Sequence, residues 1–280
     1  MMDTVSAFRQ VIERDGLTPP NAIIPDGEIH RFSSNGDRDD DAGWYVLHDD
    51  GMPAGMFGCW RSNLKKNWCA KSDTAMTETE RAEYRQRLAA IRRQRDADEQ
   101  RRHAEAATRA QTIWDQATPA PEDHPYLQKK RIQPHGLRVD DLNRLIVPVT
   151  IDGVLSSLQF IDVDSTKKFV SGGEVKGGSF MIGELTGAKT ITIVEGFATG
   201  ASLCEATGYP VGCAFSAGNL RRVAEQLRQH FPTATIVLAG DNDIRDDGKP
   251  NVGLDAATAA ADAINGVLAI PDAIDSRKTD

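Results

Sequence analysis

The feature that most constrains the fold is a regular alternation of short apolar runs and helical segments from Thr190 onward. The runs TITIV, PVGCAF, TIVLAG and GVLAIP are separated by ATGASLCEAT, NLRRVAEQLRQHF and NVGLDAATAAADAI, which are typical of helices. Apolar strands that alternate with helices are typical of a parallel sheet covered on both faces. We therefore predict an α/β fold in which ligands bind at the carboxyl ends of the strands.

Acidic residues follow two of these predicted strands. Glu195 comes directly after TITIV, and Asp241 and Asp243 come after TIVLAG. If the two strands are parallel neighbours, the three carboxylates reach the same crevice, where they repel one another unless a cation neutralises them. Carboxylate oxygens suit Mg²⁺ or Mn²⁺. Aspartate is also a common turn residue, but acids at matching strand ends favour a metal site.

The segments TIVEGFATG and TIVLAGDND together resemble the Toprim domain, in which a Glu-Gly pair follows one strand and a DxD motif follows a later one. The segments HPYLQKKRI, RLIVPVTIDGVLSSLQFID, KKFVSGGEVKGGSFMIG and NVGLDAATAAADAINGVLAIP widen the resemblance to the catalytic region of phage- and plasmid-type DNA primases. The resemblance runs from about Asp123 to the end of the chain. It implies a Toprim-type parallel sheet flanked by helices, with a basic α+β subdomain before it.

The resemblance implies a nucleotidyltransferase that synthesises short RNA primers on single-stranded DNA, in the replication of a phage, plasmid or mobile element. Such an enzyme binds a DNA template and NTPs and uses Mg²⁺ or Mn²⁺. A replicative helicase, as a separate protein or as a further part of the chain, is a candidate partner. Asp241 and Asp243 would bind the metal, and Glu195 would either complete its coordination or remove the hydroxyl proton.

Basic residues upstream of the acids are the candidates for binding nucleotide phosphates and template. Lys168 and Lys176, which flank a flexible SGG, are the first choices and are also assigned to the catalytic site; Lys167, Arg144 and Lys130 come next. Their clustering provides a basic groove on an acidic chain, although lysines on a hairpin can also serve only solubility. Asn219 is expected to cap the helix that follows it, with a nucleotide contact as the alternative.

Residues 1–76 are predicted to form a small α+β module from a short helix (SAFRQVIERDGL), a strand (DGEIHRF) and the hairpin WYVLH–DDG–AGMFGCW. The candidates for binding single-stranded DNA in this module are Trp60, Arg61, Lys65, Lys66 and Trp68, because aromatic rings stack on bases and cations neutralise phosphates. The alternative, favoured for most of the aromatic residues of the module, is that they fill its core.

Residues 77–117 contain no proline or glycine and predict a long connecting helix that begins with the capping box TETE. Its apolar residues are sparse, and its acids, interspersed among arginines, favour a solvated face over a phosphate-binding one. The predicted division is therefore an N-terminal module (1–76), a connecting helix (77–117), a basic subdomain (118–186) and a Toprim domain (187–280).

Composition excludes several other classes of protein. The net charge of −8 argues against a basic coat for duplex DNA, and the four cysteines form no CxxC pair. The absence of a long apolar run, of a signal peptide and of a GxxxxGK[ST] loop predicts a protein of the bacterial host cytoplasm without a membrane span or a helicase motor. Two alternatives stay open: a metal-dependent Toprim nuclease, and a non-catalytic module that binds DNA or a partner protein.

Overall fold

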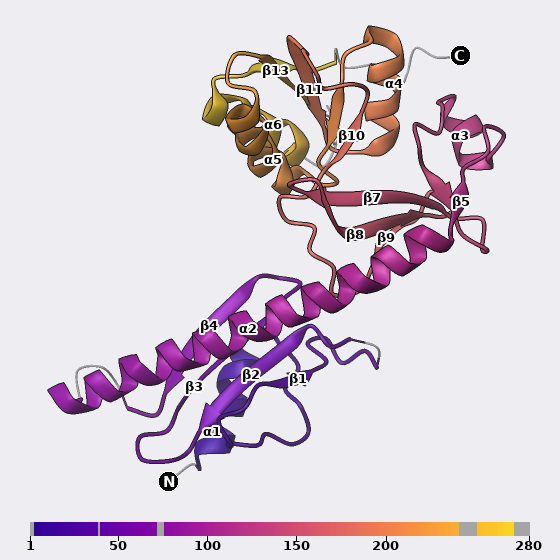
Figure 1. The fold of residues 1–280 in the computed structure, drawn as a ribbon. Helices are drawn as coiled ribbons and strands as arrows, with labels where there is room; N and C mark the ends of the chain where they lie inside the picture. Colours follow the sequence, from indigo (N-terminus) through magenta and orange to yellow (C-terminus); the bar gives the residue numbers. More distant parts are fainter. Residues whose placement is uncertain (1–2, 39, 72–75, 241–250, 272–280) are drawn as a thin grey trace. The chain divides into compact units, whose positions relative to one another are not determined.

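The computed structural model of the chain describes residues 3–38, 40–71, 76–240 and 251–271 (Figure 1). It divides into two compact units, Met1–Arg101 and Arg102–Asp280, and the boundary falls within the long helix α2 (Glu78–Gln116). The finer division into four parts stays a prediction. None of the helices in the described residues is both long and apolar enough to cross a membrane.

The first unit is built on a four-stranded antiparallel sheet in the order β1 (His30–Phe32), β2 (Gly43–His48), β3 (Ala54–Cys59) and β4 (Leu64–Cys69). Helix α1 (Thr4–Arg14) packs Phe8 and Ile12 against one face. Leu88 and Ile91 of α2 pack against Trp44 on the other face. The predicted helix, first strand and hairpin are confirmed. Strand β4 was not predicted, because its lysines hide the apolar alternation, as is common on an edge strand.

The predicted capping box at the start of α2 is confirmed. The amide N–H of Thr77 donates to the Glu80 carboxylate at 2.7 Å, and the amide N–H of Glu80 donates to Thr77 Oγ1 at 3.3 Å. Each side chain thereby satisfies an amide that the first turn of a helix leaves without an acceptor. Both bonds join residues within one turn, so the start of α2 could be predicted from the local sequence.

The second unit begins with a five-stranded antiparallel sheet in the order β5-β6-β7-β8-β9. Its strands are β5 (Thr118–Pro119), β6 (Arg138–Val139), β7 (Leu145–Ile151), β8 (Val154–Ile161) and β9 (Lys167–Phe169), and the short helix α3 (Pro125–Lys130) follows β5. One face packs Ile146 and Leu158 against Ala106 and Ala110 of α2. The other face packs toward the second sheet of the unit.

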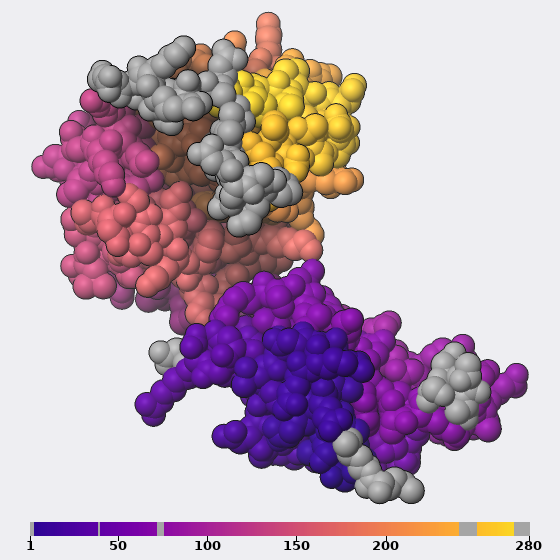
Figure 2. All heavy atoms as spheres, turned by 180° about the vertical axis from the view of Figure 1, so that it is seen from behind, coloured from indigo at the N-terminus to yellow at the C-terminus, as the bar shows by residue number. Residues whose placement is uncertain are grey.

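The second sheet has the order β10-β12-β11-β13-β14. The strands β11 (Thr190–Val194), β12 (Val211–Cys213), β13 (Thr235–Ala239) and β14 (Val267–Ala269) are parallel, and β10 (Phe180–Ile182) is an antiparallel edge. Helix α4 (Phe197–Thr207) covers one face, while α5 (Ala217–His230) and α6 (Val252–Ile264) cover the other (Figure 1). Figure 2 shows the yellow segment that contains α6 at the surface of this unit. The predicted parallel sheet is confirmed.

Two helical glycines should respond oppositely to alanine. A Cβ on Gly200 of α4 would lie 2.5 Å from Cys213 Sγ, whereas a Cβ on Gly218 of α5 would meet nothing within 4 Å. We expect Gly200→Ala to lower the free energy of unfolding by about 1–3 kcal/mol through overpacking. Gly218→Ala should raise it by about 0.5–1 kcal/mol because alanine restricts the unfolded chain. Urea unfolding of both variants tests this pair, and a stabilised Gly200→Ala protein would contradict the close packing of α4.

Candidate functional site

Glu195 lies at the carboxyl end of the central part of the parallel sheet. Strand β11 runs between β12 and β13, and its buried last residue, Val194, accepts a hydrogen bond from the amide of Ala214 at 2.8 Å. The chain then turns through the half-buried Glu195 to Gly196, which is the N-cap of α4. The fold therefore delivers this carboxylate to the edge where parallel sheets bind ligands.

The other two predicted metal ligands, Asp241 and Asp243, lie outside the described residues. Strand β13, which precedes them, pairs with β11 so that Leu238 is opposite Ile193, and Gly240 donates its amide hydrogen to Ala269 at 3.1 Å. The strand that leads to the DND motif is thus the neighbour of the strand that leads to Glu195. Among the described residues, no group of three or more metal-binding side chains occurs.

A cavity of about 170 Å³ opens beside Glu195. It is formed by α3, β9, the turn from β11 into α4 and the segment after β12, and its lining residues are Tyr126, Lys130, Lys167, Glu195, Gly196, Ala198, Thr199 and Phe215. A Cβ on Gly196 would lie 3.5 Å from Lys167 Nζ. The Lys167 ammonium therefore lies against the start of α4, and the cavity combines one carboxylate with two cations.

The two adjacent lysines of β9 point to opposite faces of their sheet. Lys167 is paired with Ile161, which belongs to the core shared with the parallel sheet, whereas Lys168 is paired with Phe160, which packs with α2. Because side chains alternate along a strand, Lys167 faces the cavity of Glu195 and Lys168 faces away from it. Of these two lysines, Lys167 is the one that lines the cavity, and the nucleotide-binding role of Lys168 stays a prediction.

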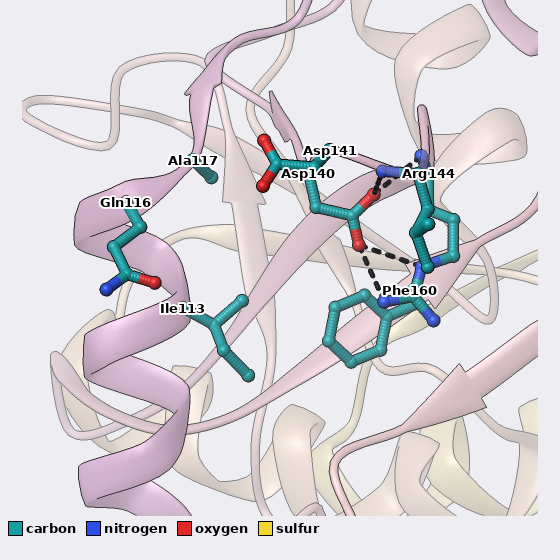
Figure 3. A pocket seen from close by; sticks show the side chains of 8 residues that line it. Ile113, Gln116, Ala117, Asp140, Asp141, Arg144 and Phe160 are labelled. Carbon is teal, nitrogen blue, oxygen red and sulfur yellow. Dashed lines mark hydrogen bonds and ion pairs between the residues drawn. The ribbon is translucent and has the colours of Figure 1, made fainter.

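Arg144 lies on the same side as Lys168 and contributes to a different cavity. Its Nε and Nη2 donate to Asp140 Oδ2 at 2.8 and 2.6 Å, and its guanidinium lies 4.3 Å from the centre of the Phe160 ring (Figure 3). Burial raises the pKa of Asp140, but hydrogen bonds from Arg144 and its charge hold that pKa below the ordinary value. Arg144 is therefore paired with Asp140, and both residues line a separate cavity of about 240 Å³.

Asn219 holds the turn that carries Lys176. The N-cap of α5 is Ser216, which corrects the expectation that Asn219 is the cap. The buried Asn219 amide accepts from the Gly177 N–H at 2.7 Å and donates to the carbonyl oxygens of Gly178 and Ala214, both at 2.9 Å, and to that of Val175 at 3.2 Å. Lys176 itself is exposed, and it does not line the cavity of Glu195 within the described part of the chain.

The aromatic candidates of the N-terminal unit pack inside it. The Trp68 ring lies 5.4 Å from that of Phe8, and the Trp60 ring lies 5.6 Å from that of Trp44. Both indoles are half-buried and pack against hydrophobic clusters on the two faces of the sheet, and their stacking on bases stays a prediction.

The basic candidates of the same unit differ among themselves. Arg61 donates to Asp40 at 2.6 Å, whereas Lys65 and Lys66 are exposed on the edge strand β4. The binding of single-stranded DNA by this unit stays a prediction.

Tyr126 and Thr199 line the cavity but were not predicted from the sequence. Tyr126 is held by His124, the N-cap of α3, whose Nδ1 accepts from the Tyr126 amide at 3.2 Å. The other ring nitrogen, Nε2, lies 2.9 Å from the carbonyl oxygen of Asn143 and donates to it. The His-Pro pair in the sequence indicates the start of a short helix that contains Tyr126. That Tyr126 lines the cavity depends on the packing of α3 near the start of α4, which the local sequence does not show.

Comparison with known proteins agrees with this geometry. Residues 190–276 match the sequence model of the Toprim domain. Two Escherichia coli proteins named DNA primase TraC are 34% identical over 257 residues and 31% identical over 258 residues. Each alignment covers 89% of this chain but only 24% and 18% of the respective relative. The chain thus carries a Toprim domain and spans a quarter or less of the length of these relatives.

Proposed function

We propose that this chain, which carries a Toprim domain, is the catalytic part of a DNA primase that joins ribonucleotides on a single-stranded DNA template. The observation that carries the proposal is the cavity in which Glu195 meets Lys130 and Lys167 at the carboxyl end of the parallel sheet. Similarity to two primases over most of the chain supports it. A replicative helicase is the proposed partner, because primers are needed where a duplex is opened.

In this reaction a 3′-hydroxyl attacks an α-phosphate and pyrophosphate leaves. Glu195, Asp241 and Asp243 would hold a divalent cation such as Mg²⁺ or Mn²⁺, which would supply positive charge against the triphosphate and against the charge that develops during transfer. Glu195 also lies where a carboxylate could accept the proton of the hydroxyl group. Lys130 and Lys167 would bind phosphate oxygens and offset the negative charge of Glu195.

The proposal is tested by incubating the protein with single-stranded DNA, labelled NTPs and Mg²⁺ or Mn²⁺. New oligoribonucleotides that depend on both the template and the metal are the expected product. Shortening of the DNA in the absence of NTPs would instead indicate a nuclease that uses the same carboxylates. DNA binding without either reaction would indicate the non-catalytic module and overturn the proposal.

The two lysines of β9 allow a matched comparison. We expect Lys167→Ala to raise the KM for NTPs about tenfold or more, because a charge-assisted hydrogen bond contributes roughly 1.5–3 kcal/mol. Lys168→Ala should change the KM by about twofold or less, since Lys168 lies on the opposite face of the same strand. Steady-state kinetics of both variants measure the difference. A larger effect of Lys168→Ala would contradict the role proposed for Lys167.

A further inference from the structure

We propose that the start of α4 and the hydroxyl group of Tyr126 form a binding site for one phosphate group of the nucleotide. This inference rests on the proposed function for the identity of the ligand, a nucleoside triphosphate or the pyrophosphate that it releases. Three features of the cavity carry it: the hydroxyl group of Tyr126, the amides of a helix terminus and two ammonium groups.

The first feature is the hydroxyl group of the buried residue Tyr126. The residue is only 1% exposed and lines the cavity, and its hydroxyl forms no hydrogen bond with any other described residue. Burial raises the pKa of Tyr126, so the phenol stays protonated at neutral pH and can donate. A ligand oxygen in the cavity would give this hydroxyl an acceptor.

The second feature is the N-terminus of α4, an 11-residue helix whose cap, Gly196, has no side chain to accept a hydrogen bond. The first intrahelical bond runs from the Gly200 amide to the Gly196 carbonyl at 3.0 Å. The amides of Phe197, Ala198 and Thr199 therefore have no acceptor within the helix. Ala198 and Thr199 line the cavity, so the positive end of the helix dipole acts on an anion bound there.

The third feature is the balance of charge and size. Lys130 and Lys167 line the cavity, and Glu195 is the one acid among its described lining residues. A phosphate group adds negative charge that the two ammonium groups and a metal at Glu195 can neutralise. The volume of about 170 Å³ is below the roughly 300–1,000 Å³ of pockets that enclose a whole small ligand. The cavity therefore suits part of a nucleotide, with the sugar and base outside it.

The test uses Tyr126→Phe, which keeps the buried ring and removes only the hydroxyl group. Pyrophosphate binding to the full chain is measured by calorimetry, with Mg²⁺ and with EDTA. We expect the variant to bind pyrophosphate more weakly by about tenfold or more, the effect of one hydrogen bond to a charged group. Its melting temperature should not fall, because the hydroxyl has no partner among the described residues.

The matched control is Tyr45→Phe in the first unit. Tyr45 is also buried, but its hydroxyl accepts a hydrogen bond from the Ile24 amide at 2.9 Å. This variant should lose stability and bind pyrophosphate normally, which is the reverse of the result expected for Tyr126→Phe.

Two outcomes would overturn the phosphate site. One is equal pyrophosphate affinity of the unaltered and Tyr126→Phe proteins, and the other is no pyrophosphate binding by the unaltered protein under either condition. Because the measurement needs no template and no turnover, its failure is distinct from a failure of the proposed primase activity.

Discussion

Replacing Glu195 by glutamine is expected to lower the rate of primer synthesis by about 10²–10³-fold, the loss typical of removing one group that stabilises charge in the transition state. Glutamine keeps the size and the hydrogen-bonding capacity of the side chain but removes its negative charge, and therefore weakens both metal binding and proton removal. The fold should be unchanged, because Glu195 is half-buried in a turn that follows the buried Val194. Primer synthesis at saturating NTP measures the loss.

The control for this variant is Glu184→Gln. Glu184 is exposed to solvent, and its carboxylate accepts hydrogen bonds from Thr186, including one from the Thr186 amide at 3.0 Å. Its replacement should leave priming within about twofold. A Glu195→Gln protein that is as active as this control would contradict the assignment of Glu195 to the site.

The role of Glu195 can be resolved with the same protein. A shift in the Mg²⁺ concentration needed for half-maximal activity would indicate a metal ligand, whereas a changed pH dependence at saturating metal would indicate a general base. Adding Asp241→Ala and Asp243→Ala should cause little further loss, because residues that act as one unit are not additive.

Replacing Asn219 by alanine is expected to destabilise the second unit by about 2–4 kcal/mol. The amide side chain makes four hydrogen bonds that join the turn of residues 175–178 to the end of β12, and the variant leaves these buried backbone groups without partners. Each lost bond costs roughly 1 kcal/mol, and unsatisfied groups cost more. Urea unfolding measures the change, and hydrogen exchange of the Gly177 amide shows whether it is local.

Asn67→Ala is the matched control, because Asn67 is exposed on the edge strand β4. A surface substitution of this kind should change the free energy of unfolding by about 0.5 kcal/mol or less. If Asn219→Ala is as stable as Asn67→Ala, the hydrogen bonds of Asn219 do not hold the turn of residues 175–178. Asn219 would then not fix the position of Lys176 in that turn either.

Several features of this protein were predictable from the sequence because they depend on residues close together in the chain. The parallel sheet followed from apolar runs that alternate with helices, and the start of α2 followed from the Thr77–Glu80 capping box. The place of Glu195 followed in the same way, since a residue directly after a parallel strand must lie at its carboxyl end.

Other features were decided only by contacts between distant segments. The spacing of Lys167 and Lys168 shows that they face opposite ways, but only the packing of β8 and β9 decides which face meets the parallel sheet. Tyr126 lines the cavity because α3 packs near the start of α4. Trp60 and Trp68 are half-buried because two helices cover the faces of their sheet. The sequence by itself determined where acids and cations occur along each element. The tertiary structure decided which of them meet, because the period of a strand or helix sets the relative direction of side chains but not the partner that covers each face.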